Sequence, residues 1–291
     1  MRYQEMLAEF VRTPWAMLPD RLASLYALVA GAARGDSQAQ EELEAKITDW
    51  RAEKIAQADG RIGLISIADV ITHRSWWGIS TTQVARDLRA FAADPSIKVI
   101  ILDIDSPGGT VSGVEELARE IHAAREHKPI VAVANSMAAS AAYWLASQAS
   151  DVVVTPTGQV GSIGVYAGHA DYSQAFEKMG IKVTLVHAGR YKVEGNPFQP
   201  LDDEARAELQ RSVDEYYRMF VSAVERGRGE LSEDVMQGRM YSAEQALKHR
   251  LVDRVATLDE TILRYAGQAK GARGKRALSD AEIEAMRLLV L

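Results

Sequence analysis

The chain has 291 residues, of which 47% are hydrophobic and 25% charged, so it can bury a large core and is not a disordered protein. Its formal charge of −6 gives no global attraction for nucleic acid, and we expect no nucleic-acid partner. The absence of cysteine excludes disulfides, thiolate metal sites and a cysteine nucleophile. Because the histidines lack metal-ligand spacing and no phosphate-binding glycine motif occurs, we expect no metal and no cofactor.

An apolar stretch at residues 22–33 is similar to the hydrophobic region of a signal peptide. The segment before it contains Glu5, Glu9 and Asp20, which do not make a basic leader. The stretch is also shorter than the ~20 apolar residues that a membrane-spanning helix needs. We therefore expect a packed or oligomer-contacting helix and no integral membrane segment.

The composition divides the chain into three parts. Residues 1–56 are predicted to form an N-terminal helical arm, broken near residues 31–36, with Ser37 as the cap of a second helix. Residues 57–262 form the main domain. Residues 263–291 are predicted to be a basic linker, with its cations between 268 and 277, and a short C-terminal helix.

Apolar strands and amphipathic helices alternate through the main domain, which predicts βαβ units and an α/β fold with a parallel sheet. The expected strands are residues 62–67, 99–104, 130–134, 151–154 and 182–186. The expected helices are residues 80–92, 113–126, 138–148, 176–179 and 202–226, with two further short helices capped by Ser232 and Ser242.

The motif DSPGGT at 105–110 directly follows one of the apolar strands. Ligand sites of open α/β sheets lie at this edge. Gly108 and Gly109 let the backbone turn without a Cβ, and their N–H groups, next to a helix N-terminus, suit a developing oxyanion. The alternative is a plain strand-to-helix turn.

Ser140 lies in the first turn of the alanine-rich helix predicted after the 130–134 strand, where it can face the site. The alternative is a small residue chosen for tight helix packing. Ser136, four residues earlier, is interpreted as the helix cap.

Lys192 lies in a loop after the 182–186 segment, in the run GRYKVEG with glycine on both sides. That is an unusual setting for a surface lysine, although most isolated lysines are surface residues. Ser162, in the run GSIGV at 161–165, is either part of the same site or a turn residue.

Taken together, these motifs resemble the signal peptide peptidase A family of Ser/Lys proteases, in the Clp protease/crotonase superfamily. The matching runs are DSPGG, MAAS ending at Ser140, GSIGV, GRYK ending at Lys192, and GRMYSAEQALKHRLVD at 238–253, all in the family's order. The resemblance covers roughly residues 60–260 and implies a spiral of ββα units.

The resemblance also implies a mechanism. Ser140 would be the nucleophile and Lys192 the general base, because a serine hydroxyl needs an adjacent base and burial favours the neutral amine of lysine. Ser162 would orient the Lys192 amine, and Gly108 and Gly109, mainly the Gly109 N–H, would form the oxyanion hole. Family members commonly carry two glycines after the nucleophile. Here they are Ala141 and Ala142, which predicts a narrower pocket.

Within the family, residues 10–31 resemble the phage prohead-protease branch. The implied substrates are proteins or peptides, with phage scaffold, portal or capsid proteins as partners. The implied location is the bacterial or host cytoplasm, or the inside of the procapsid. The apolar residues of the N-terminal arm lead us to expect a ring-like homo-oligomer. The alternative within the family is a bacterial protease that degrades signal peptides or other peptides.

Three further alternatives remain. A Ser-His-Asp protease on the same fold would use His169 and Asp171, but it leaves Lys192 unexplained. A crotonase-type acyl-CoA enzyme would use the oxyanion hole without a nucleophile. An inactive scaffold or shell protein would use none of these residues.

Overall fold

The structure of the chain, a computed structural model, describes Tyr3, Met6, Leu7 and residues 14–49, 54–57, 61–74 and 78–271. The predicted helix at the C-terminal end and most of the predicted basic linker lie outside the described residues.

The core of the main domain is a sheet whose central strands, β3, β6, β8 and β9, run parallel to one another. Its order is β11-β10-β8-β6-β3-β2, with β9 pairing the first half of β8 and β12 pairing β9. The strands are β2 (Lys54–Gln57), β3 (Ile62–Ala68), β6 (Val99–Ser106), β8 (Ile130–Ala139), β9 (Asp151–Val154), β10 (Gln159–Gly161), β11 (Met240–Ser242) and β12 (Arg254–Val255). The predicted α/β fold class is confirmed.

A second, small sheet lies at the carboxyl ends of these strands, in the order β1-β7-β4-β5. Its strands are β1 (Trp15–Met17), β4 (Ile71–Thr72), β5 (Ile79–Ser80) and β7 (Gly108–Thr110). The chain therefore passes twice in succession from a long strand to a helix, through two short strands (β4 and β5) the first time and through one (β7) the second time. The first unit ends in α4 (Thr81–Ala93) and the second in α5 (Val114–Ala124). These are the ββα units that the resemblance predicted.

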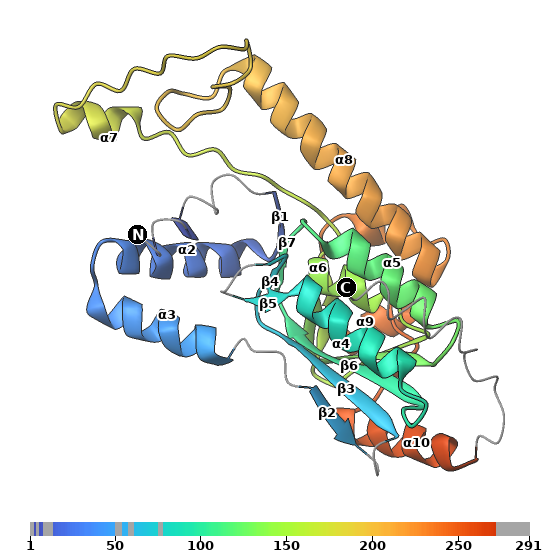
Figure 1. Cartoon of the computed structure of the whole chain (residues 1–291). Coiled ribbons are helices and arrows are strands. Elements are labelled where there is room, and N and C mark those ends of the chain that lie inside the picture. The colour runs from blue at the N-terminus through green and yellow to red at the C-terminus, as the bar shows by residue number, and fades with distance from the viewer. Residues whose placement is uncertain are drawn as a thin grey trace.

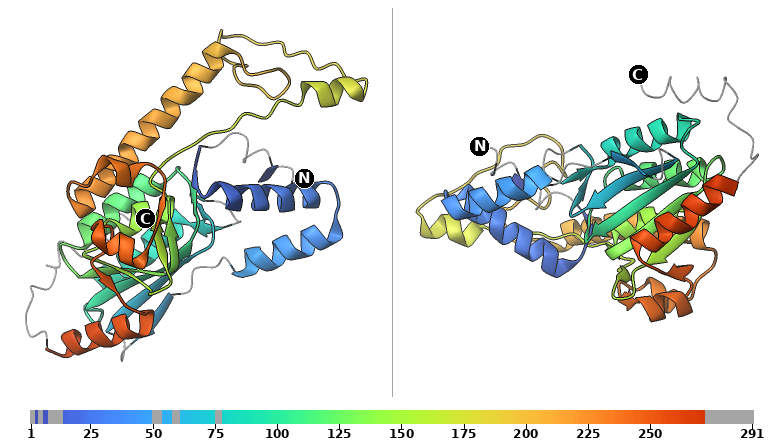
Figure 2. Two further views of the ribbon diagram at one scale, coloured as in Figure 1. Left: turned by 180° about the vertical axis from the view of Figure 1, so that it is seen from behind. Right: turned by 90° about the horizontal axis from the view of Figure 1, so that it is seen from below.

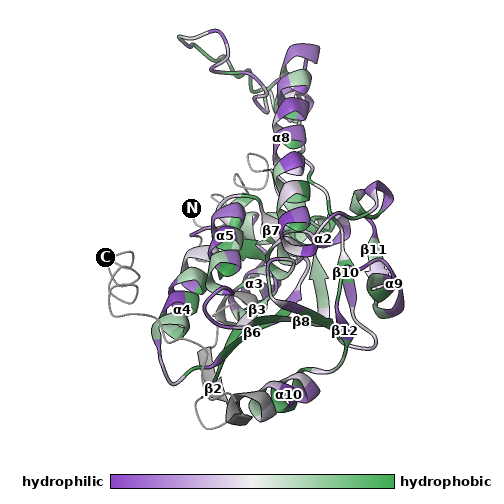
Figure 3. Cartoon of the chain, turned by 90° about the vertical axis from the view of Figure 1, so that its right-hand side faces the viewer, coloured by the Kyte–Doolittle hydropathy of each residue, from purple (hydrophilic) through white to green (hydrophobic). Residues whose placement is uncertain are grey.

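Helices cover both faces of the parallel sheet because its strands are apolar on both sides. Helices α4 and α5 lie on one face and α10 (Leu258–Gly271) on the other (Figure 3). Helix α6 (Ala141–Ala146) packs in the same core cluster as α4 and α5. Tyr265 of α10 packs in a separate small cluster with Ile62, Ile101 and Val153. The domain limit expected at residue 262 falls inside this helix.

Within the expected N-terminal arm, α2 (Pro19–Ala33) and α3 (Ser37–Asp49) are helical as predicted. Residues 15–17 and 54–56 are not helical: they belong to β1 and to β2, and β2 pairs with β3 of the main sheet. The break between the two helices includes Gly35, whose φ of 93° is the left-handed region that favours glycine. Both helices lie beside the sheet, on the side toward which residues 167–202 extend (Figure 2).

Residues 167–202, called here the projecting segment, leave the body of the molecule and return through α8 (Asp203–Arg228) (Figure 1). The segment contains α7 (Ser173–Lys178). The strand predicted at 182–186 is wrong, since these residues have no regular structure and Val186 is 96% exposed. Its apolar residues have no neighbouring strand with which to form a ladder.

Two smaller expectations near the site need correction. Strand β8 continues to Ala139, so Ser136 lies inside a strand and does not cap a helix. The helix after it spans Ala141–Ala146 and is shorter than predicted. The two short helices predicted near the end of the main domain are confirmed. A 3-10 turn (Glu233–Met236) follows Ser232, and α9 (Ala243–Lys248) follows Ser242. Ser242 makes a capping box with Gln245.

Glu115 joins three helices at the base of α8. Its carboxylate accepts hydrogen bonds from Arg226 of α8 at 3.0 Å, from Trp144 of α6 at 3.1 Å and from Arg119 at 2.7 Å. The Trp144 ring also stacks on Phe220 with centroids 4.5 Å apart. Burial by itself raises the pKa of Glu115, but the Arg226, Arg119 and Trp144 hydrogen bonds outweigh it and hold the pKa below its ordinary value.

We predict that Glu115→Gln lowers the free energy of unfolding by about 1.5–3 kcal/mol, because charged hydrogen bonds are lost. In the wild type this contribution is present above the ordinary glutamate pKa of about 4.3 and is lost as the pH falls through the lowered folded-state pKa. Urea denaturation between pH 3 and 7 measures both effects. The exposed neighbour Glu116→Gln is the control. Equal stability of the two variants would contradict the role of Glu115.

Candidate active site

Ser140 forms the turn between strand β8 and helix α6. Its φ of 55° and ψ of −118° lie in a region that residues with a Cβ rarely adopt. Two backbone hydrogen bonds hold it there: Ser140 N–H donates to Gly161 O at 2.8 Å, and Trp144 N–H donates to Ser140 O at 2.9 Å. The hydroxyl therefore stands at the carboxyl edge of the sheet, at the start of a helix, as a nucleophile requires.

The strand β7 lies directly beside this turn. A methyl group added to Gly108 would lie 3.0 Å from Ser140 Cβ, and one added to Gly109 would lie 1.8 Å from Ile71 O. Both positions thus require glycine. Gly108 N–H donates to Ser106 Oγ at 3.2 Å, so it is already bonded within the chain. Of the two donors expected for an oxyanion hole, Gly109 N–H is the one that Ser106 does not engage.

Ser162 lies next to Ser140. Strand β10 pairs parallel with β8, with Gly161 opposite Ala139, so the next residue of each strand is a predicted site serine. Ser162 has a φ of 54°, is 7% exposed, and donates its N–H to Arg239 O at 2.7 Å. The Ser140 hydroxyl is directed at Gly164 O, 3.4 Å away. The structure thus brings Ser140, Ser162, Gly108 and Gly109 together.

Lys192 is elsewhere, in the projecting segment. It is exposed and lines a cavity of about 700 Å³ between this segment and the start of α8, with Tyr172, Phe198 and Leu201. A hydrogen bond of 2.9 Å between the Tyr172 and Tyr26 hydroxyls ties this region to the N-terminal arm. Within this chain the structure therefore does not bring Lys192 to Ser140.

The residues of the Ser-His-Asp alternative also lie in the projecting segment. His169 Nε2 is 3.3 Å from Gln199 O, and the Asp171 carboxylate accepts from Ser173 N–H at 2.8 Å. Neither interaction directs the imidazole toward Ser140.

Strand β1, which covers the site, is not among the elements predicted from the sequence. β1 runs antiparallel to β7, and Ser140 beneath it is 1% exposed. The run Trp15-Ala16-Met17 is too short for a visible alternation, and the two prolines at 14 and 19 mark its ends. Those prolines are a weak signal that a short extended segment lies between them.

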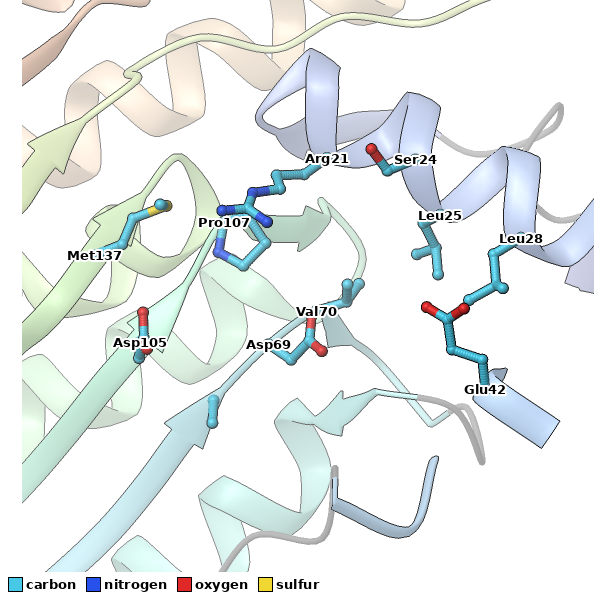
Figure 4. A pocket seen from close by; sticks show the side chains of 11 residues that line it. Arg21, Ser24, Leu25, Leu28, Glu42, Asp69, Val70, Asp105, Pro107 and Met137 are labelled. Atoms are coloured by element: carbon cyan, nitrogen blue, oxygen red, sulfur yellow. The ribbon is translucent and has the colours of Figure 1, made fainter. Parts of the chain in front are cut away.

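A cavity of about 510 Å³ adjoins the site where β1 continues into α2 (Figure 4). Arg21 and Leu25 of α2 face Asp69 and Asp105 across it (Figure 4). Burial raises the pKa of Asp105. Its hydrogen bond with Ser136 and the charge of Arg21 lower this pKa, while the neighbouring Asp69 carboxylate raises it further.

Among the described residues, no helix is long and apolar enough to cross a membrane, and no group of three or more acidic or histidine side chains is placed to hold a metal ion.

An α/β domain with a serine at a strand-to-helix turn, beside a glycine strand, has the architecture of a serine hydrolase site. The sequence profile of peptidase family S49 matches residues 122–272, a little over half of the chain. This chain belongs to peptidase family S49, and the predicted family is confirmed.

Of three relatives of this chain, two are named as proteases. Capsid assembly protease C of Escherichia phage lambda is 39% identical over 191 residues, which are 64% of this chain and 43% of that protein. The head-tail preconnector protein GP5 of Enterobacteria phage P21 is 35% identical over 60% of this chain and 35% of its own length. Protease 4 of Salmonella typhi is 29% identical over 66% of this chain and 31% of its own length. The chain thus matches less than half of each of these proteins.

Among solved structures, an enoyl-CoA hydratase/isomerase family member superposes with a TM-score of 0.47 at 14% identity, covering 82% of each chain.

The positive φ at Ser140 predicts a difference in stability between two variants that both lack the hydroxyl. Ser140→Gly and Ser140→Ala both remove the hydroxyl, but glycine adopts the observed conformation without a Cβ penalty. We expect the glycine variant to be more stable than the alanine variant by about 1–3 kcal/mol. Chemical denaturation measures the difference. An alanine variant as stable as the glycine variant would show that the turn is not strained.

Proposed function

We propose that this chain is a serine endopeptidase in which Ser140 is the nucleophile and Lys192 the general base. The observation that carries the proposal is the turn at Ser140, which sets the serine beside Gly108 of strand β7, the neighbour of Gly109, in a chain of peptidase family S49. Ser140 Oγ attacks the substrate carbonyl while the Lys192 amine accepts its proton. Gly109 N–H stabilises the oxyanion, and Ser162 orients the amine. The proton then passes to the leaving amine, and water hydrolyses the acyl-enzyme.

The position of Lys192 bears on how the dyad assembles. The projecting segment holds Lys192 away from the sheet, and α8 is fixed at its base by the Glu115–Arg226 ion pair. The segment also exposes several large apolar side chains, a surface typical of a protein contact. They are Met179, Ile181, Leu185, Val186 and Tyr191. We therefore infer a homo-oligomer in which the projecting segment of one copy supplies Lys192 to Ser140 of its neighbour.

Two phage relatives support a substrate class for this chain, one named as a capsid assembly protease and the other as a head-tail preconnector protein. We propose that this chain cuts phage scaffold, portal or capsid proteins during head assembly, in the host cytoplasm or inside the procapsid. The similarity to Protease 4 supports the second candidate, a bacterial protease that degrades signal peptides or other peptides.

The division of the chain into an N-terminal arm (1–56), a protease domain (57–262) and a C-terminal linker with a short helix (263–291) is part of the same proposal. Helices α2 and α3 support it for the arm, because they pack against each other beside the domain. The limits themselves shift in the structure, since β2 (Lys54–Gln57) pairs with β3 and Tyr265 of α10 packs on the sheet.

We predict that Ser140→Ala and Lys192→Ala each abolish cleavage of casein and of purified head proteins, while both variants keep the fold and the assembly mass. Because the two residues act as a unit, the double variant is no worse than either single one. A fluorophosphonate probe should label the wild type and not Ser140→Ala. Full activity in Lys192→Ala, with loss in His169→Ala instead, would exclude the dyad.

Co-expression of the two inactive variants tests where the lysine comes from. If neighbouring copies complete each other's site, a random mixture of Ser140→Ala and Lys192→Ala chains regains about a quarter of the wild-type rate. The control is Ser140→Ala co-expressed with the double variant, which regains none. An inactive mixture of the two single variants would show that each dyad forms within one chain.

A further inference from the structure

Strand β1 pairs with β7 in a defined register. The two strands are antiparallel, with Ala16 opposite Gly109, and hydrogen bonds flank this pair on both sides. The flanking bonds run from Val111 N–H to Pro14 O at 3.4 Å and from Leu18 N–H to Pro107 O at 3.0 Å. In an antiparallel ladder, bonded and non-bonded pairs alternate. Ala16 and Gly109 are therefore a bonded pair, in which Gly109 N–H donates to the Ala16 carbonyl oxygen.

This places the Ala16 carbonyl at the reaction centre. A methyl group added to Gly108 would lie 2.1 Å from Ala16 O and 3.0 Å from Ser140 Cβ, so both atoms border the same point. The Ala16 carbonyl thus occupies the place of a substrate carbonyl, opposite the N–H that the proposed mechanism assigns to the oxyanion.

The other edge of β1 is also paired. Trp15 N–H donates to Tyr166 O at 2.8 Å, and Tyr166 N–H donates to Trp15 O at 3.1 Å. Tyr166 directly follows the GSIGV run that contains Ser162. The segment therefore lies between two backbone edges of the site, as an extended peptide does when it is bound by strand addition.

The segment leaves no room for a second peptide. Trp15, Ala16 and Met17 are 1%, 0% and 1% exposed, and Ser140 beneath them is 1% exposed. Any protein substrate must displace these residues before it can reach the hydroxyl.

We propose that residues 14–18 are an internal competitor bound in the substrate cleft in the register of a substrate, with Ala16 immediately before the bond presented to Ser140. This inference rests on the proposed peptidase function and adds to it the identity of the first occupant of the site. It also predicts a small residue before the cleaved bond, because Ala16 is fully enclosed there.

The chemistry is that of the proposed reaction. Ser140 Oγ bonds to the Ala16 carbonyl carbon, and the bond from that carbon to Met17 N breaks. The Ser140 proton passes through Lys192 to the Met17 amine, and water then hydrolyses the serine ester. In a single chain Lys192 is held in the projecting segment, so the segment lies in the cleft without the base needed to cut it.

The test uses full-length Ala16→Asp, because burying a carboxylate at this enclosed position is unfavourable and drives the segment out. The matched control is Ala23→Asp, on the exposed face of α2. With a fluorogenic reporter peptide carrying alanine before the cleaved bond, we expect Ala16→Asp to lower KM at least tenfold with kcat little changed. Ala23→Asp should match the wild type. Trp15→Ala, which weakens the packing of the segment without adding charge, should shift KM in the same direction.

A synthetic peptide of residues 12–20 tests the register directly. It should inhibit Ala16→Asp competitively and be cut between Ala16 and Met17, as mass spectrometry would show. The same peptide with aspartate at position 16 should do neither. Equal KM values in all four proteins, or cleavage of the peptide at another bond, would overturn the proposal.

The fluorophosphonate probe keeps the two hypotheses apart. If Ser140 of Ala16→Asp reacts with the probe and cuts the reporter, but the peptide of residues 12–20 does not compete, the internal competitor is wrong and the peptidase function stands. If Ser140 reacts with no probe and no peptide is cut in any variant, the peptidase function itself fails.

Discussion

At Ser140 the chain changes from strand to helix within one residue, with a backbone conformation that favours glycine. The conformation persists because the packing on both sides of Ser140 fixes the course of the backbone. All six residues of α6 are buried, and β8 is fixed between β6 and the pair β9 and β10. The hydroxyl, the Gly161 carbonyl that accepts from the Ser140 N–H, and the neighbouring Ser162 are positioned together by this single turn.

The glycines of β7 depend on the same constraint. Gly109 approaches Ile71 so closely that a side chain would collide with its carbonyl, and Gly108 approaches both Ser140 and the N-terminal arm. Because these glycines have no side chain, neighbouring backbone can approach β7 closely. The Gly109 N–H is therefore accessible to a bound peptide, and β1 can pair with β7. The features that would stabilise a transition state therefore also make a binding edge for the chain's own N-terminal segment.

The sequence predicted the parallel strands, the order of the helices and the residues that gather around Ser140, because each depends on a local pattern or a recognisable motif. It did not predict β1, since three residues give no periodicity and their partner is more than ninety positions away. Residues 182–186 have the composition of a strand but no neighbour to pair with, so composition was misleading there. The surroundings of Lys192 could not be predicted either, because they depend on the conformation of the whole projecting segment, for which no local pattern exists.

Helix α8 has a mechanical consequence. It is 26 residues long, which corresponds to ~39 Å, and its last turns are clamped to the body by Arg226 and Phe220. A helix of that length with a fixed base is rigid. In an assembly, the length of α8 would therefore determine the spacing between neighbouring subunits that contact its free end. Insertion or removal of four residues would change that spacing by ~6 Å and rotate the tip by ~40°.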